Sequence, residues 1–175
     1  IGSPQILMLS GVGPGAELQK LGIEVESNLK GVGENLQDHL QARPVFKTNL
    51  STINIETNNY LKQALIGLQY ILTQTGPMTM AASLGTAFLK TEAHLETPDI
   101  QFHIQPFSAD MPSKSTHKFS AFTASVLQLR PESTGYLKLR SPNFMDSPEI
   151  YPNYLSTDTD CRTIVKGVKI ARKIA

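Results

Sequence analysis

The sequence predicts an α+β fold, in which helices cover an antiparallel sheet of about five or six strands. Four runs are rich in Phe, Ile, Val and Leu and partly alternate with polar residues, which is typical of strands. Two other segments space their apolar residues three to four positions apart, as on one face of a helix. The links between the later strands are short, which favours antiparallel neighbours. The strand-like runs are 84–90, 99–107, 119–129 and 135–140.

The first stretch of the chain, SPQILMLSGVGPGAELQKLG at residues 3–22, raises the alternative of a dinucleotide-binding domain. Gly11, Gly13 and Ala16 fit the G-x-G-x-x-G/A spacing, and Glu34 follows about 20 residues on as a candidate ribose partner. A nicotinamide-binding domain built on these glycines is therefore one hypothesis for this segment.

Three features of the same stretch favour two short helices instead. Ser3 and Pro4 suit a helix start, because Ser can cap free amides and Pro at the first helical position loses no hydrogen bond. Pro14 removes an amide that would otherwise hold a pyrophosphate. A dinucleotide unit also needs a second parallel strand, and residues 23–40 supply only the short extended piece IEV. The predicted helices are 4–10 and 14–21.

The middle of the chain contains a predicted strand and a long helix. Residues 40–48 alternate well enough for a strand, although Pro44 confines it to an edge or a bulge. The polar stretch 49–59 is expected to be a loop. Residues 60–73 have the spacing of an amphipathic helix, and Gly76 and the proline after it are expected to stop it. Its apolar face consists of Leu61, Ala64, Leu65, Leu68, Ile71 and Leu72.

Two segments near the end of the sequence predict a hairpin and a final helix. The short link RPESTG, residues 130–135, suggests an antiparallel hairpin between the strands on either side of it. The last helix is expected to begin at STDTD, residues 156–160, and to continue to the end of the chain. Its acidic start and basic end suit the helix dipole.

Composition excludes several classes of function. The 16 basic and 15 acidic residues leave a formal charge of +1. The sequence contains no run of basic residues, so we do not expect a nucleic-acid partner. Cys161 is the single cysteine, so we expect no disulfide and assign it no role. The four histidines lack short metal-ligand spacing, which predicts no metal site. No apolar run reaches the length of a transmembrane segment. The chain starts without Met and ends within a helical pattern, so we interpret both ends as cuts.

Polar residues inside one strand-like run are the best candidates for a binding site. Gln101, His103 and Gln105 in PDIQFHIQPF share one face of a strand, because side chains alternate with a period of two. They could line a pocket, or they could simply face water on a half-exposed strand. Met78 and Met80 could edge a cavity, since thioethers adapt to irregular apolar shapes, or they could be ordinary core residues.

The adjacent Asp38 and His39 could orient an imidazole for acid–base chemistry. Neighbouring residues rarely converge on one reacting atom, however, and no serine or cysteine nucleophile is tied to this pair. The sequence therefore favours a hydrogen-bond cluster that holds the loop in place.

Taken in order, the motifs resemble the glucose-methanol-choline (GMC) family of flavin-dependent oxidoreductases over essentially the whole chain. The segment GSPQILMLSGVG is similar to the family's second motif, and GVGENLQDH to the loop after it. The segments GPMTMAASLGTAFL and PDIQFH resemble parts of its substrate domain. The stretch 129–160 resembles the opening of its C-terminal region. Within the family, the sequence is most similar to the choline-dehydrogenase-like branch. The matching segments are 2–13, 31–39, 76–89, 98–103 and 129–160.

This resemblance implies a cofactor, a reaction and a set of site residues. FAD would accept a hydride from an alcohol, and a histidine would take the hydroxyl proton. The FAD fingerprint and the catalytic histidine of the family lie outside this chain, so no catalytic residue is assigned here and the chain alone is expected to be inactive. The residues implied near the cofactor are Gly2, Ser3, Pro4 and Gln5, and those implied at the substrate cavity are Gln101, His103, Gln105 and Met80.

The resemblance also implies two regions, 1–39 beside the FAD domain and 40–175 as the substrate-binding domain. The expected partners are a small alcohol, the rest of the FAD domain and an electron acceptor of unknown kind. The alternative function is a non-catalytic binding or assembly domain, in which the polar strand face and the methionine loop contact another protein.

Overall fold

The computed structural model divides the chain into two compact units. The described residues are 1–81, 83–111 and 114–175. Unit 1 contains residues 1–39 and 131–161, and unit 2 contains residues 40–130 and 162–175. The regions implied by the sequence, 1–39 and 40–175, have the same boundary after His39. The sequence assigns residues 131–161 to the second region, whereas the structure groups them with residues 1–39.

Unit 2 is built on a five-stranded antiparallel sheet, which confirms the predicted fold class. Its strands lie in the order β3-β7-β6-β5, and β4 also pairs with β7. The bounds are β3 Gln41–Ala42, β4 Val45–Lys47, β5 Gly85–Leu89, β6 Ile100–Gln105 and β7 Ala121–Gln128. Ala82, which belongs to one of the family-like segments, lies outside the described residues, as do Pro112 and Ser113.

Pro44 splits the strand predicted at residues 40–48 into β3 and β4. Its carbonyl accepts a hydrogen bond from the Ala124 amide at 3.1 Å. Proline has no amide to donate in return, so the ladder with β7 is interrupted at this position. The expectation that Pro44 restricts this strand is confirmed.

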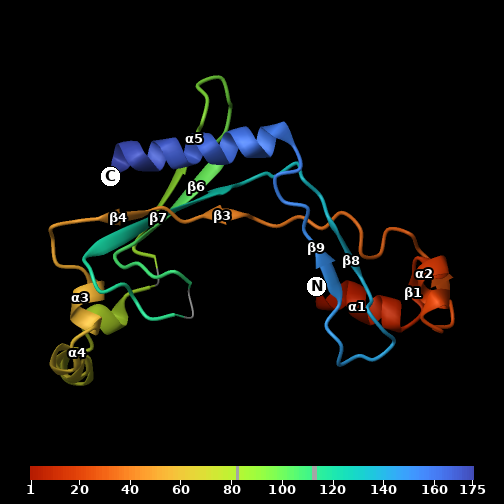
Figure 1. Cartoon of the computed structure of the whole chain (residues 1–175), viewed down its shortest axis with the longest axis horizontal. Coiled ribbons are helices and arrows are strands. Elements are labelled where there is room, and N and C mark those ends of the chain that lie inside the picture. Colours follow the sequence, from red (N-terminus) through yellow and green to blue (C-terminus); the bar gives the residue numbers. More distant parts are fainter. Residues whose placement is uncertain (82, 112–113) are drawn as a thin grey trace. The chain divides into compact units, whose positions relative to one another are not determined.

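Helix α5, Asp158–Ile174, packs along one face of the sheet (Figure 1). Phe102 on β6, Val126 on β7 and Ala171 on α5 are all fully buried in this core. The closest approach is at Gly167, where a Cβ atom would lie 2.7 Å from Cγ2 of Val126. The first turn of α5 carries Asp158 and Asp160, and its last turn carries Arg172 and Lys173, in agreement with the predicted helix polarity.

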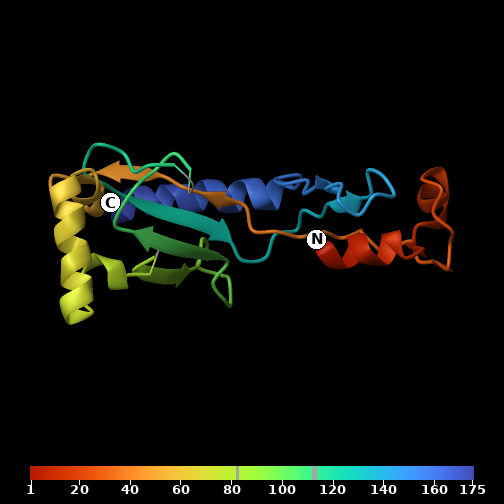
Figure 2. The ribbon, with the colours of Figure 1, turned by 90° about the horizontal axis from the view of Figure 1, so that it is seen from below.

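Helix α4, Tyr60–Thr73, has the bounds that its sequence spacing predicts. Gln74 ends it in the left-handed conformation, with φ of 55°. In Figure 2 α4 stands at one end of unit 2, and none of its residues is buried. The short 3₁₀ turn η1, Pro77–Thr79, follows it. No described helix has the length and apolar character needed to cross a membrane.

The loop predicted at residues 49–59 is wrong in one part, because it contains helix α3, Ile53–Thr57. Asn54 of this helix is fully buried. Its Nδ2 donates to the Ser108 hydroxyl and to the Phe119 carbonyl, both at 2.9 Å. These partners lie more than 50 positions away in the chain, so local composition does not predict the helix.

Unit 1 begins with two helices, as expected, and ends with a small hairpin. Met8, Leu18 and Leu137 form its buried cluster. A two-stranded parallel pair joins β1 and β2, and an antiparallel pair joins β8 and β9. The bounds are α1 Gly2–Leu9, β1 Val12–Gly13, α2 Gly15–Lys20, β2 Ser27–Asn28, β8 Tyr136–Lys138 and β9 Glu149–Tyr151.

Two details predicted for unit 1 are wrong. Ser3 does not cap α1, because it lies inside the helix and Ile1 is the N-cap residue. The paired strand β2 begins two residues after the short extended piece expected at 23–25. The link 130–135 does not make a hairpin of β7 and β8. The Asp160 carboxylate accepts hydrogen bonds from the amides of Glu132 and Ser133, at 3.0 and 2.9 Å, and β8 pairs with β9 instead.

Two fully buried serines of unit 2 differ in their hydrogen bonding. The Ser108 hydroxyl lies 2.9 Å from Nδ1 of His117 and accepts from Asn54. The Ser125 hydroxyl has no hydrogen-bond partner among the residues that the structure describes. A buried hydroxyl without a partner keeps its full desolvation cost.

The contact between α5 and β7 predicts opposite effects for two glycine substitutions. Gly167→Ala should lower the free energy of unfolding by about 1–2 kcal/mol, because the added methyl displaces Val126. Gly67→Ala in α4 is the control, since no atom lies within 4 Å of the added methyl. It should raise stability by about 0.5–1 kcal/mol through helix propensity. Urea denaturation of both variants measures the two values, and equal signs would contradict the packing described.

Replacing each of the two buried serines by alanine should also change stability in opposite directions. Ser108→Ala should cost about 1–3 kcal/mol of unfolding free energy, because it leaves buried partners unsatisfied. Ser125→Ala should leave stability unchanged or raise it, because it removes a hydroxyl that has no described partner. Thermal or urea denaturation of the two variants side by side is the measurement. A large loss for Ser125→Ala would mean that its hydroxyl has a partner after all.

Candidate functional site

The side of the sheet that faces away from α5 carries polar side chains, and we call it the polar face. Strand β6 directs Ile100, Phe102 and Ile104 toward α5, where they contact the buried core. By the alternation of a strand, the intervening residues lie on the opposite side. The polar side chains of this face are Gln41, Arg43, Lys47, Thr86, Gln101, His103, Gln105, Thr123 and Ser125. The same alternation places the apolar residues Val45, Phe88, Ala121 and Leu127 on this side as well.

The pairing of the strands brings part of the predicted site into one row. His103 on β6 is paired with Thr86 on β5 and with Ser125 on β7. His103 is half-buried and Thr86 is exposed, whereas Ser125 is fully buried. Of these three side chains, the imidazole of His103 is the one that is neither fully buried nor exposed.

Arg43 completes this row and was not predicted from the sequence. The pairs Ala42 with Val126 and Val45 with Thr123 place Arg43 beside Ser125, on the other edge of β7. Its Nη2 donates a hydrogen bond to Oε1 of Gln105, at 3.1 Å. Because Gln105 belongs to β6, the Arg43 side chain reaches across β7. Only the strand register could have revealed this neighbour.

The other predicted site residues lie elsewhere. Met80 follows η1 and is half-buried. Gly2, Ser3, Pro4 and Gln5 form the first turn of α1, in unit 1. No side chain caps this end of the helix, so its first amides have no side-chain partner at the cap.

The glycine-rich turn after α1 does not have the form of a phosphate cradle. Gly11 has φ of +80°, and a Cβ atom on it would lie 2.4 Å from the Glu24 carbonyl oxygen. A Cβ atom on Gly13 would lie 2.9 Å from the Met8 side chain. The space beside both glycines is therefore filled by the protein itself. The residues that would precede them as a strand form α1, which argues against the nicotinamide hypothesis.

Asp38 holds a loop, as the sequence favours. The Tyr154 hydroxyl donates a hydrogen bond to its carboxylate. This bond keeps the pKa of Asp38 below its ordinary value and raises the pKa of Tyr154. Asp38 thus joins two segments of unit 1 that are far apart in the sequence, and no contact between its side chain and a nucleophile is present in the described part of the chain.

Ser108, His117 and Asp110 form a hydrogen-bonded chain that resembles a hydrolytic triad in its residue types. Nε2 of His117 lies 3.1 Å from Oδ1 of Asp110, and Nδ1 lies 2.9 Å from the Ser108 hydroxyl. Ser108 is fully buried, however, and its hydroxyl also accepts from Asn54. A nucleophile must reach its substrate, so this chain of bonds anchors α3 and is not a catalytic site.

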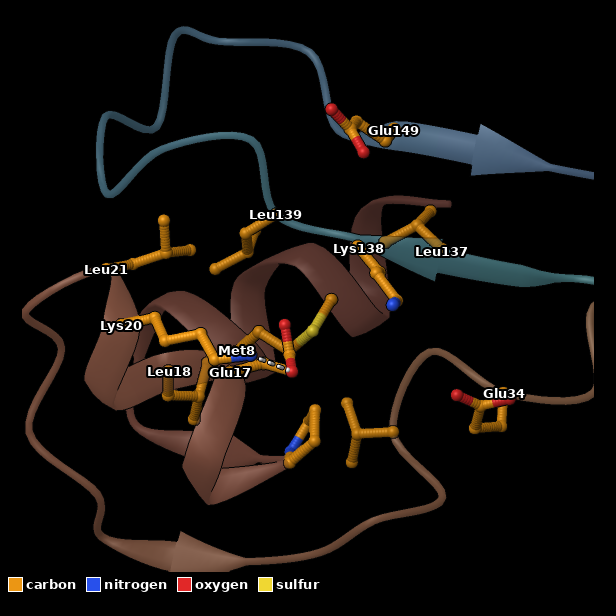
Figure 3. A pocket seen from close by; sticks show the side chains of 12 residues that line it. Met8, Glu17, Leu18, Lys20, Leu21, Glu34, Leu137, Lys138, Leu139 and Glu149 are labelled. Carbon is orange, nitrogen blue, oxygen red and sulfur yellow. Dashed lines mark hydrogen bonds and ion pairs between the residues drawn. The ribbon is translucent and has the colours of Figure 1, made fainter.

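Unit 1 contains a cavity of about 290 Å³, lined by α1, α2 and β8 (Figure 3). Its walls are mainly apolar and include the core residues Met8, Leu18 and Leu137. Glu17 and Lys20 form an ion pair of 2.8 Å at its edge. The lining has no His, Cys, Ser or Thr side chain, so the cavity offers apolar contact without a nucleophile or an imidazole. No group of three or more metal-ligating side chains occurs in the described residues.

Comparison with known proteins gives matches along the whole chain. Residues 131–175 match the family model described as GMC oxidoreductase. The chain is 39% identical to mitochondrial choline dehydrogenase of Mus musculus over 177 residues, which is 99% of this chain and 29% of that protein. It is 36% identical to "Alcohol dehydrogenase [acceptor]" of Pseudomonas putida, over 99% of this chain and 32% of that protein. The chain thus spans about a third or less of these relatives.

Solved structures share the fold. A formate oxidase of Aspergillus oryzae superimposes with a TM-score of 0.82 and 21% identity, over 98% of this chain and 34% of that one. An FAD-dependent oxidoreductase of Chaetomium thermophilum has a TM-score of 0.77 and 24% identity, over 99% and 36%. The motif resemblance, the family match and the relatives agree, and the chain belongs to the GMC oxidoreductase family, with choline dehydrogenases among its relatives.

Proposed function

We propose that this chain supplies the substrate-binding part of an FAD-dependent oxidoreductase that oxidises an alcohol to an aldehyde or ketone. The membership of the GMC family supports the reaction class, and relatives named as choline and alcohol dehydrogenases support an alcohol substrate. The observation that carries the assignment to this chain is the polar face, where a half-buried imidazole lies among amide and hydroxyl side chains.

The oxidation removes two hydrogens from the alcohol. The carbon gives up a hydride and the hydroxyl gives up a proton, so that the C–O single bond becomes a carbonyl. FAD accepts the hydride when it is bound. The proton acceptor of the family lies outside this chain, and none of the four histidines here takes that role.

The side chains of the polar face would bind and orient the alcohol. His103 has ring nitrogens that can donate or accept, and Gln101 and Gln105 offer both amide donors and carbonyl acceptors. Holding the substrate in one pose lowers the barrier, because the reacting carbon then stays close to its acceptor. Met80, which follows η1 in the same unit, is a further candidate for an adaptable apolar contact with the substrate.

Two segments of unit 1 can be compared as possible contacts for the FAD cofactor. The glycine turn after α1 does not fit a pyrophosphate, because the protein fills the space beside Gly11 and Gly13. The first turn of α1, Gly2–Gln5, fits better: no atom lies within 4 Å of a Cβ added to Gly2, and no side chain caps the helix. We therefore assign the contact with the cofactor to this turn.

The proposal predicts where flavin binding resides. The complete protein that contains this chain should purify with the absorbance of an oxidised flavin, and an alcohol should bleach it under anaerobic conditions. A panel of alcohols that includes choline tests this. Residues 1–175 alone should be colourless and inactive, because the FAD fingerprint lies outside them. A complete protein without flavin would instead favour a non-catalytic binding or assembly domain.

The role of His103 predicts a change in turnover that a matched histidine does not share. His103→Ala in the complete protein should lower kcat/KM for the alcohol about tenfold, because one hydrogen bond to the substrate is lost. The control is His94→Ala, since His94 is exposed on the loop between β5 and β6. Steady-state kinetics of both variants measure the effect. Equal kinetics for His103→Ala and the wild type would remove His103 from the site.

A further inference from the structure

We propose that the alcohol bound at the polar face carries no positive charge, and that Arg43 imposes this selectivity. The inference rests on the proposed function, because it concerns the substrate of the same site. It goes further by naming a charge class and a residue that determines it. Arg43 was not among the residues that the motifs or the strand pattern singled out.

Arg43 brings a permanent positive charge to the row that contains His103. A guanidinium is a planar cation that donates hydrogen bonds and accepts none. Arg43 is half-buried, so water screens its charge less than it would screen that of an exposed side chain. The hydrogen bond to Gln105 uses one of its five N–H donors and holds the guanidinium above β7. The remaining donors suit a neutral or negatively charged oxygen.

The sheet offers no carboxylate to offset this charge. The five strands, all of whose residues the structure describes, contain neither Asp nor Glu. Asp99 immediately precedes β6, but its carboxylate accepts from the amide and the hydroxyl of Thr91, at 2.7 and 2.5 Å. The second cation of the strands on this side is Lys47, whose ammonium lies 4.9 Å from the centre of the Phe119 ring.

Recognition of a cationic ligand needs a carboxylate or a cage of aromatic rings. The chain has no Trp, and Phe88 is the aromatic residue that strand alternation places on the side of the polar face. Phe46, Phe102 and Phe122 belong to the opposite side, which packs against α5. A cation beside Arg43 would therefore receive no compensating carboxylate from the strands of this sheet. Two like charges about 10 Å apart, at an effective dielectric constant of about 20, weaken binding about tenfold or more.

This inference separates the chain from relatives that are named for choline, an alcohol with a quaternary ammonium group. The separation can be tested with two alcohols of nearly the same shape. Choline and 3,3-dimethylbutan-1-ol differ in that a quaternary nitrogen in the first is a quaternary carbon in the second. Any difference in their binding therefore reports on charge.

The experiment measures binding of both alcohols to the complete flavoprotein by isothermal titration calorimetry, after chemical reduction of the flavin. A reduced flavin cannot accept a hydride, so binding is measured without turnover. We expect 3,3-dimethylbutan-1-ol to bind at least about tenfold more tightly than choline. In Arg43→Gln the two dissociation constants should approach each other. Lys47→Gln is the matched control and should keep the wild-type ratio.

The outcomes distinguish this inference from the proposed function. Equal or tighter binding of choline by the wild type would overturn the inference, as would an unchanged ratio in Arg43→Gln. Failure of both alcohols to bind would also overturn it, because the polar face would then hold no alcohol of this size. Failure of every alcohol to bleach the oxidised flavin, with the binding ratio intact, would refute the oxidation reaction and leave the charge selectivity of Arg43 standing.

Discussion

Strand β7 is paired along both of its edges, and this pairing determines which side of the sheet each side chain faces. Its register with β6 runs from Ile100–Gln128 to Gln105–Thr123, and β3 and β4 occupy the other edge. A shift of one residue would exchange the two sides. Helix α5 fits against Val126 only because Gly167 has no side chain there. The apolar side is thus enclosed, and the polar residues are collected on the other.

The same pairing explains why Arg43, Ser125 and His103 become neighbours. They come from three segments that lie far apart in the sequence, and each enters the row through its strand partner. Hydrophobic burial against α5 stabilises the register, while the polar residues contribute little to it. The buried Ser125 hydroxyl even opposes stability.

Local sequence patterns predicted the elements whose cause is local. The alternation of residues 100–105 and the spacing of residues 60–73 identified β6 and α4, and the missing amide of Pro44 anticipated the break between β3 and β4. Contacts between distant segments were not visible. Helix α3 depends on Asn54 reaching Ser108, the β8–β9 pair replaces a hairpin that the short link favoured, and Arg43 joins the polar face through register alone. The contacts of Gly2–Gln5 with a cofactor, and those of Gln101, His103, Gln105 and Met80 with a substrate, remain predictions.

The order of the two units along the chain affects how the protein is made. Unit 1 closes its core with Leu137, which packs with Met8 and Leu18 from the other end of the sequence. A ribosome that has released residues 1–39 must therefore synthesise all of residues 40–130 before that core can form. Long-range closure of this kind slows folding, because the loop entropy is lost before the contacts form. Helices α1 and α2 therefore keep the apolar side chains that contact Leu137 uncovered by this residue until residues 131–137 have been synthesised.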